Sequence, residues 1–238
     1  MAQLLPLGTS RLIGWRMVKF SPCRETDLVN FLAEIMIKVI RRLLLLLWMG
    51  HASAALEEPT IVVLGDSLSA GYQLPAEHAW PALLALKLRE QGFKYKVINA
   101  GISGDTTAGG LARLPQLLSK YHPDCLIVEL GANDGLRGLS LQHAERNLAE
   151  IIEQGLAAGS RVLLVGMQIP ANFGPRYSEF FQQMYPRLSQ RYSVSLMPFL
   201  FASLDENPNL FLADMLHPNS RGQQLLMKDV LASLKRHR

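Results

Sequence analysis

From Thr60 onward, short apolar runs alternate with longer amphipathic stretches. Short runs rich in Val, Ile and Leu are typical of strands buried on both faces, whereas apolar positions three and four residues apart predict helices. The predicted strands are Ile61–Gly65, Tyr95–Asn99, Cys125–Leu130, Arg161–Met167 and Val194–Met197. The predicted helices are Ala79–Gln91, Ala108–Lys120, Leu141–Ala158, Pro175–Tyr192 and Ser220–Arg236. This alternation predicts an α/β domain with a mostly parallel sheet covered on both faces.

The most polar loops of this pattern follow the first three predicted strands and precede the last predicted helix. Right-handed crossovers place the carboxyl ends of parallel strands at one edge of the sheet, where ligands bind. The loops in question contain residues 66–67, 100–106, 131–135 and 213–218. We therefore expect their side chains to meet in one site.

Ser67 is the candidate nucleophile, because the apolar run 61–65 leads directly into Gly65-Asp66-Ser67. The same tripeptide is also common turn chemistry, with glycine at positive φ and Asp and Ser bonding local backbone. The G-x-S-x-G signature of many serine hydrolases is not met, since position 69 is Ser. The catalytic interpretation therefore depends on partners elsewhere.

His217 and Asp214 are the candidate partners, since they lie three residues apart on one predicted loop, with Pro218 next. An aspartate so close can fix the tautomer of an imidazole whose other nitrogen faces a serine. Alternatively, both residues are loop caps, since Asp, Pro and Asn219 all favour turns before helices. The other histidines lie in the first 54 residues, near helix ends, in loops or in the basic tail.

Candidate oxyanion donors come from the remaining loops. The backbone N–H groups of Ser67 and Gly104 and the side-chain amide of Asn133 are suited to bind a developing negative charge. Each is also ordinary turn chemistry when taken alone. A serine mechanism of this kind needs no cofactor and no metal, and the nucleotide and zinc motifs are missing from the sequence.

The net positive charge of the chain comes from its first 54 residues. Residues 1–54 contain seven Lys or Arg and three acidic residues, whereas the remainder contains 17 of each kind. The net charge of +4 thus belongs to the leader, and a neutral globular part gives no support to nucleic-acid binding.

The leader has the order of a secretory signal peptide. A basic region that starts at Met36 precedes the apolar residues 43–50 and an A-x-A site at 52–54. We predict a non-native extension over 1–35, a signal peptide over 36–54 cleaved near Ala54, and one domain over 55–238. The alternative is an uncleaved anchor, although eight apolar residues are too few to span a bilayer. Only Cys125 would remain after cleavage, which excludes an internal disulfide.

Four separated motifs together resemble the SGNH (GDSL) hydrolase superfamily. They are Gly65-Asp-Ser67-Leu, Gly104 within Ile-Ser-Gly-Asp-Thr, Gly131-Ala-Asn133-Asp, and Asp214-Met-Leu-His217-Pro. Between them the chain is most similar to the bacterial acyl-CoA thioesterase, lysophospholipase and arylesterase members. The resemblance implies a flavodoxin-like three-layer α/β/α fold with a five-stranded parallel sheet. It also implies Ser67 as nucleophile, His217 as base, Asp214 as its orienting acid, and Ser67, Gly104 and Asn133 as oxyanion hole.

The candidate substrate-binding residues are mostly apolar: Leu68, Leu136, Arg137, Ile169 and Pro170, with Leu139 and Phe173 beside them. Apolar walls suit an acyl chain, and Arg137 can meet an anionic head group. The alternative is that these leucines belong to the core.

We therefore expect a periplasmic or secreted serine esterase of a Gram-negative cell, acting as a monomer without a stable membrane anchor on fatty-acyl thioesters and oxyesters. The alternatives are a carbohydrate acetylesterase of the same superfamily and a non-catalytic lipid-binding envelope protein.

Overall fold

The computed structural model describes residues 33–42, 58–204 and 207–236, and the chain divides into two units, Met1–Glu57 and Glu58–Arg238. In the first unit, residues 33–42 form a helix with an ion pair between Lys38 and Glu34. The apolar stretch and cleavage site predicted for the signal peptide lie outside the described residues. Among the described residues, no helix has the length and apolar character needed to cross a membrane.

The second unit is built on a five-stranded sheet in which every neighbouring pair is parallel. The strands are β1 (Thr60–Gly65), β2 (Lys96–Asn99), β3 (Cys125–Glu129), β4 (Arg161–Val165) and β5 (Ser195–Met197), in the order β2-β1-β3-β4-β5. This order confirms the predicted flavodoxin-like sheet. The order in which the strands are connected reverses between β1 and β3, which is where ligands bind in this fold.

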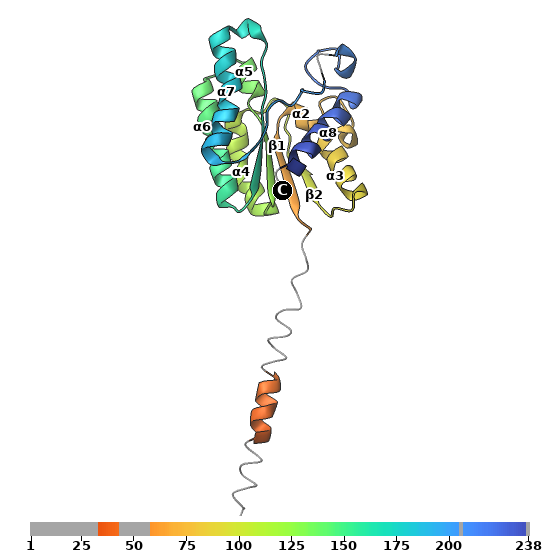
Figure 1. Ribbon diagram of the computed structural model, residues 1–238, viewed down its shortest axis with the longest axis vertical. Helices are drawn as coiled ribbons and strands as arrows, with labels where there is room; N and C mark the ends of the chain where they lie inside the picture. Colours follow the sequence, from red (N-terminus) through yellow and green to blue (C-terminus); the bar gives the residue numbers. More distant parts are fainter. Residues whose placement is uncertain (1–32, 43–57, 205–206, 237–238) are drawn as a thin grey trace, which may run out of the picture. The chain divides into compact units, whose positions relative to one another are not determined.

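Helices cover both faces of the sheet (Figure 1). On one face lie α4 (Thr107–Tyr121), α6 (Leu141–Ala157) and α7 (Pro175–Tyr192), and on the other α3 (Trp80–Glu90) and α8 (Ser220–Arg236). All five were predicted to within a few residues. The central strands β1 and β3 are buried along their whole length, whereas the edge strand β2 is partly exposed. The core between the layers holds the carboxyl ends of β1 and β3 in fixed positions.

Five short elements were not predicted from the sequence. They are the helices α2 (Ser67–Ala70) and α5 (Ala132–Leu136) and the 3-10 turns η1 (Ala76–His78), η2 (Ala171–Phe173) and η3 (Pro208–Leu210). Segments of three to five residues are too short to show a helical apolar period. The polar loops predicted after β1 and β3 each include one turn of helix.

Candidate active site

Ser67, His217 and Asp214 form a connected chain of hydrogen bonds. The Nε2 atom of His217 lies 2.8 Å from the Oγ atom of Ser67, and its Nδ1 atom lies 2.7 Å from Oδ2 of Asp214. The structure thus brings together three side chains that the sequence separates by up to 150 residues. An imidazole held in this way can accept the proton of the serine hydroxyl while the carboxylate stabilises the imidazolium.

Ser67 owes its position to the junction between β1 and α2. It is the first residue of α2, and Asp66 caps this helix by accepting a hydrogen bond from the N–H of Leu68 at 3.0 Å. Gly65 does not adopt the positive φ expected of a turn glycine. Instead, a Cβ atom there would clash with the side chain of Ser69, so glycine is needed for space.

The loop before α8 fixes the imidazole. Asp214 Oδ1 accepts hydrogen bonds from the backbone N–H groups of Leu216 and His217, both at 3.0 Å, while Oδ2 faces the ring. Met215 adopts a left-handed conformation with φ +57°, and the backbone N–H of Leu212 donates to the carbonyl of His217 at 2.8 Å. Asp214 is therefore both the loop cap and the partner of His217, and the two interpretations of the sequence are compatible.

These contacts set the ionisation of Asp214. Desolvation alone would raise its pKa, but hydrogen bonds from the backbone of His217 and Leu216 and from the His217 ring outweigh it. The net effect lowers the pKa of Asp214 to about 2. The carboxylate therefore stays ionised across the pH range in which an imidazole changes its charge.

The candidate oxyanion residues lie in the same cavity as Ser67 and His217. Gly104 has φ +80°, a conformation that L side chains rarely adopt, which explains glycine at this position. Asn133 lies in α5, and its Nδ2 donates to Asp66 Oδ2 at 3.1 Å. The cap of α2 uses the N–H of Leu68 rather than that of Ser67. All three predicted donors are thus gathered at the carboxyl edge of β1, β2 and β3.

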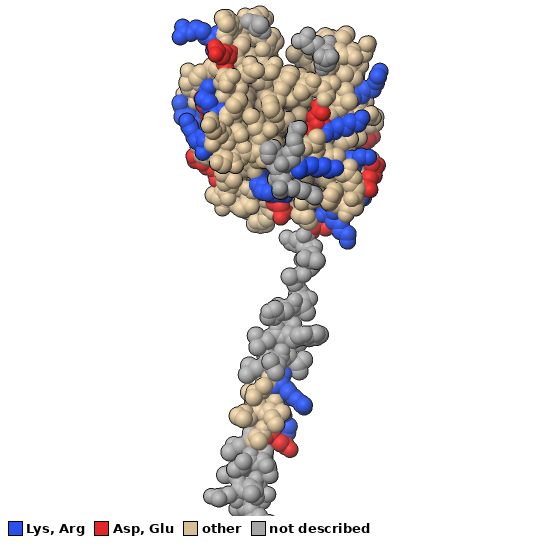
Figure 2. Space-filling model, viewed as in Figure 1, with Lys and Arg blue, Asp and Glu red and all other residues tan. Residues whose placement is uncertain are grey.

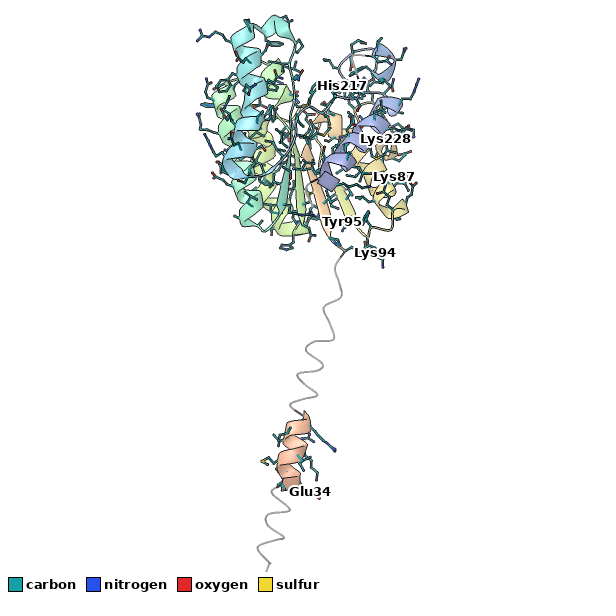
Figure 3. All side chains as sticks on the ribbon, in the orientation of Figure 1. Glu34, Lys87, Lys94, Tyr95, His217 and Lys228 are labelled. Atoms are coloured by element: carbon teal, nitrogen blue, oxygen red, sulfur yellow. The ribbon has the colours of Figure 1, made fainter. Side chains whose placement is uncertain are left out.

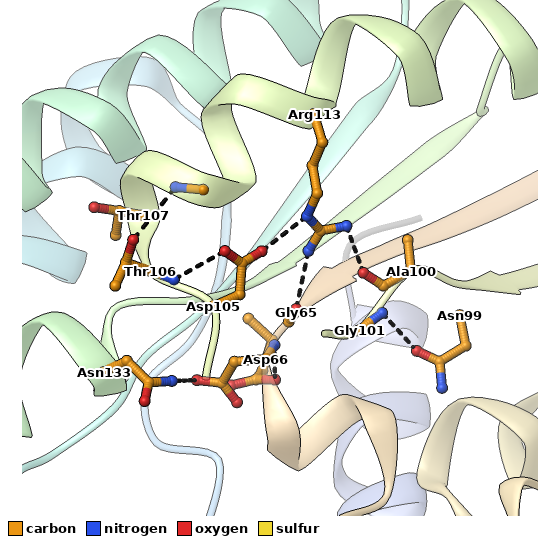
Figure 4. A network of polar contacts seen from close by, with 12 residues as sticks. Gly65, Asp66, Asn99, Ala100, Gly101, Asp105, Thr106, Thr107, Arg113 and Asn133 are labelled. Carbon is orange, nitrogen blue, oxygen red and sulfur yellow. Dashed lines mark hydrogen bonds and ion pairs between the residues drawn. The ribbon is translucent and has the colours of Figure 1, made fainter. Parts of the chain in front are cut away.

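Arg113 of α4 connects the loops that follow β1 and β2 (Figure 4). Its guanidinium donates to Asp105 Oδ2 at 2.8 Å, to the carbonyl of Ala100 at 2.5 Å and to the carbonyl of Gly65 at 3.0 Å. Asn99 adds a further link by donating to the carbonyl of Ser69 at 2.8 Å. This network holds the nucleophile loop and the Gly104 loop together, and it was not predicted from the sequence.

A buried carboxylate pair lies beneath the nucleophile turn. Glu129, the last residue of β3, is fully buried, and its Oε2 accepts hydrogen bonds from Ser69 Oγ at 2.6 Å and from the N–H of Asp66 at 3.4 Å. Desolvation and the nearby Asp66 raise the pKa of Glu129 well above its usual range. Desolvation also raises the pKa of Asp66, to about 6. The pair was not predicted, although an acid within the apolar run 125–130 is a signal in the sequence that could have indicated it.

The cavity around Ser67 has a volume of about 300 Å³. The predicted residues Leu68, Leu136 and Pro170 line it. Unpredicted lining residues come from loops that the sequence could not place together: Tyr72, Ser103, Met167, Gln168, Phe201 and Leu216. The ring of Tyr72 lies against that of His217, with 4.3 Å between their centroids.

Several predicted binding residues lie outside the cavity wall. Ile169 packs towards Gly135, where its methyl group would lie 2.8 Å from an added Cβ atom. Phe173 stacks on Tyr177 at a centroid distance of 6.1 Å. Arg137 donates to the carbonyl of Gly104 at 2.7 Å and to Asn133 Oδ1 at 3.4 Å. Arg137 therefore borders the candidate oxyanion residues, whereas Ile169 and Phe173 are occupied by packing.

The described part of the chain holds no cluster of side chains suited to bind a metal ion, since no three or more of its His, Cys, Asp or Glu residues are placed so that they could hold one. Cys125 is buried in β3, and desolvation raises the pKa of its thiol to about 11.

This fold and this arrangement are those of a flavodoxin-like α/β protein with a candidate serine-hydrolase site at the carboxyl edge of its parallel sheet. The model of the GDSL-like lipase/acylhydrolase family matches residues 63–225, and the chain belongs to this family. The chain is accordingly a hydrolase that acts on esters, as its resemblance to SGNH hydrolases implied.

Three similar proteins support this assignment. The chain is 43% identical over 199 residues to an arylesterase of Vibrio mimicus, covering 84% of this chain and all of that protein. It is 44% identical over 184 residues to thioesterase 1/protease 1/lysophospholipase L1 of Escherichia coli, covering 77% of this chain and 86% of that protein. The psychrotrophic esterase EstA from Pseudoalteromonas, solved in a form inhibited by monoethylphosphonate, superposes with a TM-score of 0.72 at 38% identity, covering 74% of this chain and 97% of EstA.

Proposed function

We propose that this chain hydrolyses fatty-acyl thioesters and oxyesters through a covalent acyl-enzyme on Ser67. The Ser67 Oγ attacks the acyl carbon while His217 Nε2 takes the hydroxyl proton, and Asp214 stabilises the resulting imidazolium. Collapse of the tetrahedral intermediate transfers that proton to the leaving thiol or alcohol. Water then attacks the acyl-enzyme with His217 again as base, which releases the fatty acid and restores Ser67.

The negative oxygen of each tetrahedral intermediate would be bound by three donors. These are the backbone N–H groups of Ser67 and Gly104 and the side-chain amide of Asn133. Asn133 Nδ2 carries two hydrogens, of which one is used towards Asp66, so the other can serve the oxyanion. Loss of one such donor typically lowers turnover by about 100-fold to 1000-fold.

One observation supports the proposal more strongly than the others. A single imidazole lies within hydrogen-bond distance of both a serine hydroxyl, at 2.8 Å, and a carboxylate, at 2.7 Å, at the wall of a cavity. A histidine that only stabilised its own loop would have no reason to contact Ser67. The arrangement meets the geometric requirement for an activated serine nucleophile.

The cavity favours an acyl chain as substrate. Leu68, Leu136, Met167, Phe201 and Leu216 contribute apolar side chains to its wall. Each methylene that moves from water into such a wall contributes about 0.8 kcal/mol, so longer acyl chains should be preferred. The names of the relatives from Vibrio mimicus and Escherichia coli, which include arylesterase, thioesterase and lysophospholipase, agree with this substrate class.

A series of p-nitrophenyl esters from acetyl to palmitoyl tests both parts of the proposal. We expect kcat/KM to rise with chain length beyond butyryl and Ser67→Ala to abolish turnover while leaving the melting temperature unchanged. A maximum at acetyl with a decline beyond butyryl would indicate the carbohydrate acetylesterase instead. Full turnover by purified Ser67→Ala protein would refute the mechanism.

We also propose that the enzyme is exported and acts as a monomer without a membrane anchor. The support is the order of basic region, apolar stretch and A-x-A site in residues 36–54. Amino-terminal sequencing of the protein recovered from the periplasm should give a chain that begins at Ala55. A periplasmic or membrane-bound chain that retains residues before Met36 would contradict this expectation.

A further inference from the structure

The exposed apolar side chains of the second unit are not scattered. In residues 58–204 and 207–236, eight large hydrophobic side chains are exposed. Three of these line the Ser67 cavity, and three more lie within three residues of a lining residue in the chain. We call these six the collar: Tyr72, Ile102, Leu136, Leu139, Met215 and Leu216. The other two, Leu86 and Leu156, lie on α3 and α6. Single exposed apolar residues need no explanation, but such a concentration marks an interaction surface.

The collar members come from four segments of the chain that each contribute to the cavity wall. Tyr72, Leu136 and Leu216 line the cavity themselves. Ile102 lies two residues from Gly104, Leu139 follows Leu136 by three, and Met215 stands between Asp214 and Leu216. Ile102, Leu139 and Met215 do not contribute to the cavity wall, so acyl-chain binding inside the cavity does not account for their exposure.

The six collar side chains are themselves uncharged. Figure 3 places His217 at the upper end, whereas the labelled Lys87, Lys228 and Lys94 lie along the flank and at the lower end. On the face that Figure 2 shows, the Lys, Arg, Asp and Glu residues lie mainly on the flanks and the lower half, with basic and acidic side chains also at the upper left edge. The collar side chains can therefore contact an apolar layer without burying a charge of their own.

One cation stands within the collar. Arg137 lies between Leu136 and Leu139 in the chain, is exposed, and is held at the mouth by Nη2, which donates to the carbonyl of Gly104. Both contacts of this guanidinium use the same nitrogen, Nη2. Guanidinium groups bind phosphate oxygens well, whereas apolar side chains enter the boundary between head groups and acyl chains. An apolar ring with one guanidinium therefore fits a phospholipid surface.

We propose that the collar docks the mouth of the active site onto the surface of a phospholipid layer or micelle. This inference rests on the proposed function, because it specifies how amphiphilic substrates reach Ser67. An acyl chain that passes from the layer through the collar into the cavity does not cross water, and so avoids the unfavourable hydration of its methylenes. The substrate class this favours is a single-chain phospholipid presented by an aggregate.

The test uses two matched pairs of substitutions in the full chain. The collar pair is Ile102→Gln with Leu139→Gln, and the control pair is Leu86→Gln with Leu156→Gln. The exposed fractions are 52% and 43% in the collar pair and 52% and 40% in the control pair, so each pair removes a similar apolar surface. None of the four residues belongs to the proposed catalytic group, and none lines the Ser67 cavity. This includes Leu139, which the sequence placed beside the candidate substrate-binding residues but which is not part of the cavity wall.

Binding is measured first, in a Ser67→Ala background so that no lipid is consumed. The probe is a vesicle of phosphatidylcholine containing lysophosphatidylcholine, and the readout is the bound fraction after co-sedimentation. We expect the collar pair to weaken binding about tenfold and the control pair to leave it within about twofold. An equal effect of both pairs, or no effect of either, would overturn the proposal. No effect of either pair is also the result expected if the vesicles bind the N-terminal segment, which is the same in all variants.

Activity is measured second, with Ser67 intact. The collar pair should lower turnover of micellar lysophosphatidylcholine about tenfold and leave turnover of soluble p-nitrophenyl butyrate unchanged. Sedimentation velocity tests whether a second copy of the chain covers the collar instead of lipid. A dimer that the collar pair disrupts, in a chain that does not bind vesicles, would refute docking on lipid. Failure of the proposed function can be told apart from failure of the docking proposal. Vesicle binding is measured in Ser67→Ala protein and does not depend on whether the wild-type chain hydrolyses either ester.

Discussion

At the scale of single residues, the proposed mechanism depends most on what Asp214 does for His217. Both carboxylate oxygens are engaged, one by two backbone N–H groups and one by the imidazole. Asp214→Asn keeps the cap but offers the ring an amide in place of a carboxylate. We expect kcat to fall by roughly 10⁴-fold with little change in KM. Steady-state kinetics on a p-nitrophenyl ester would measure this, and a loss of less than about tenfold would argue against an orienting role.

The same residue predicts a pH dependence of stability. The pKa of Asp214 is about 2 in the folded chain, below the usual value of about 3.9 in unfolded chains. Ionisation of Asp214 therefore stabilises the fold above about pH 4, and this contribution is lost as the pH falls towards 2. The difference in urea stability between the wild-type chain and Asp214→Asn should be largest above about pH 4 and should shrink as the pH falls towards 2. A constant difference across this range would contradict the lowered pKa.

Glu129 predicts the opposite dependence. Desolvation raises its pKa in the folded chain, so folding favours the protonated form, and its contribution to stability is lost as the pH rises above the usual carboxyl value. Glu129→Gln, which mimics the protonated acid, should therefore stabilise the fold at pH 8 relative to the wild type and have less effect at pH 4. The exposed Glu150→Gln is the matched control. Urea unfolding at both pH values is the measurement, and a stability loss at pH 8 would show that the carboxylate is needed in its ionised form.

At the scale of elements, Arg113 of α4 connects the loop that follows β2 to the end of β1 through hydrogen bonds. Its guanidinium contacts one carboxylate and two carbonyl groups, and the side chain is only 19% exposed. Lysine has a single ammonium and cannot reproduce this planar fork. We expect Arg113→Lys to lower kcat about tenfold or more by loosening Ser67 and Gly104, and Arg113→Met to cost about 3 kcal/mol of stability.

The control for this prediction is Arg89→Lys on the exposed surface of α3. This variant should keep the melting temperature of the wild-type chain and its kcat on a short p-nitrophenyl ester. If Arg113→Lys were equally silent, the network of Figure 4 would have no part in positioning the site.

The element scale also shows what the sequence could and could not predict. The five strands and five long helices were predictable because each carries an apolar pattern that the core requires. The single turns α2 and α5 were not, since their formation depends on tertiary contacts. In α5, for example, Asp134 accepts hydrogen bonds from the N–H of Thr107 at 2.9 Å and from its Oγ1 at 2.7 Å. Ser67, Gly104, Asn133, Asp214 and His217 were predicted as site residues from spacing and resemblance. Tyr72, Arg113 and Phe201 were not, because nothing local marks a residue whose partner comes from another loop. Glu129 is marked locally as an acid within an apolar run, but its partners Ser69 and Asp66 lie in another part of the sequence.

At the scale of the whole molecule, the sheet order explains why residues so far apart in sequence share one cavity. β1 lies between β2 and β3, so the loops carrying Ser67, Gly104 and Asn133 leave the sheet side by side. The loop before α8 then adds Asp214 and His217 at the same edge. The segments that carry the collar are those that build the cavity, so the proposed docking surface lies beside the site.

The central claim is that Ser67 is the nucleophile, and covalent trapping tests it most directly. The full chain is treated with an alkyl fluorophosphonate, digested, and analysed by mass spectrometry alongside Ser67→Ala and the matched control Ser69→Ala. We predict one phosphonyl group per chain on the peptide that contains Ser67, retained in Ser69→Ala and lost in Ser67→Ala together with esterase activity. Modification of a different residue, or an unlabelled Ser67 in fully active enzyme, would contradict it.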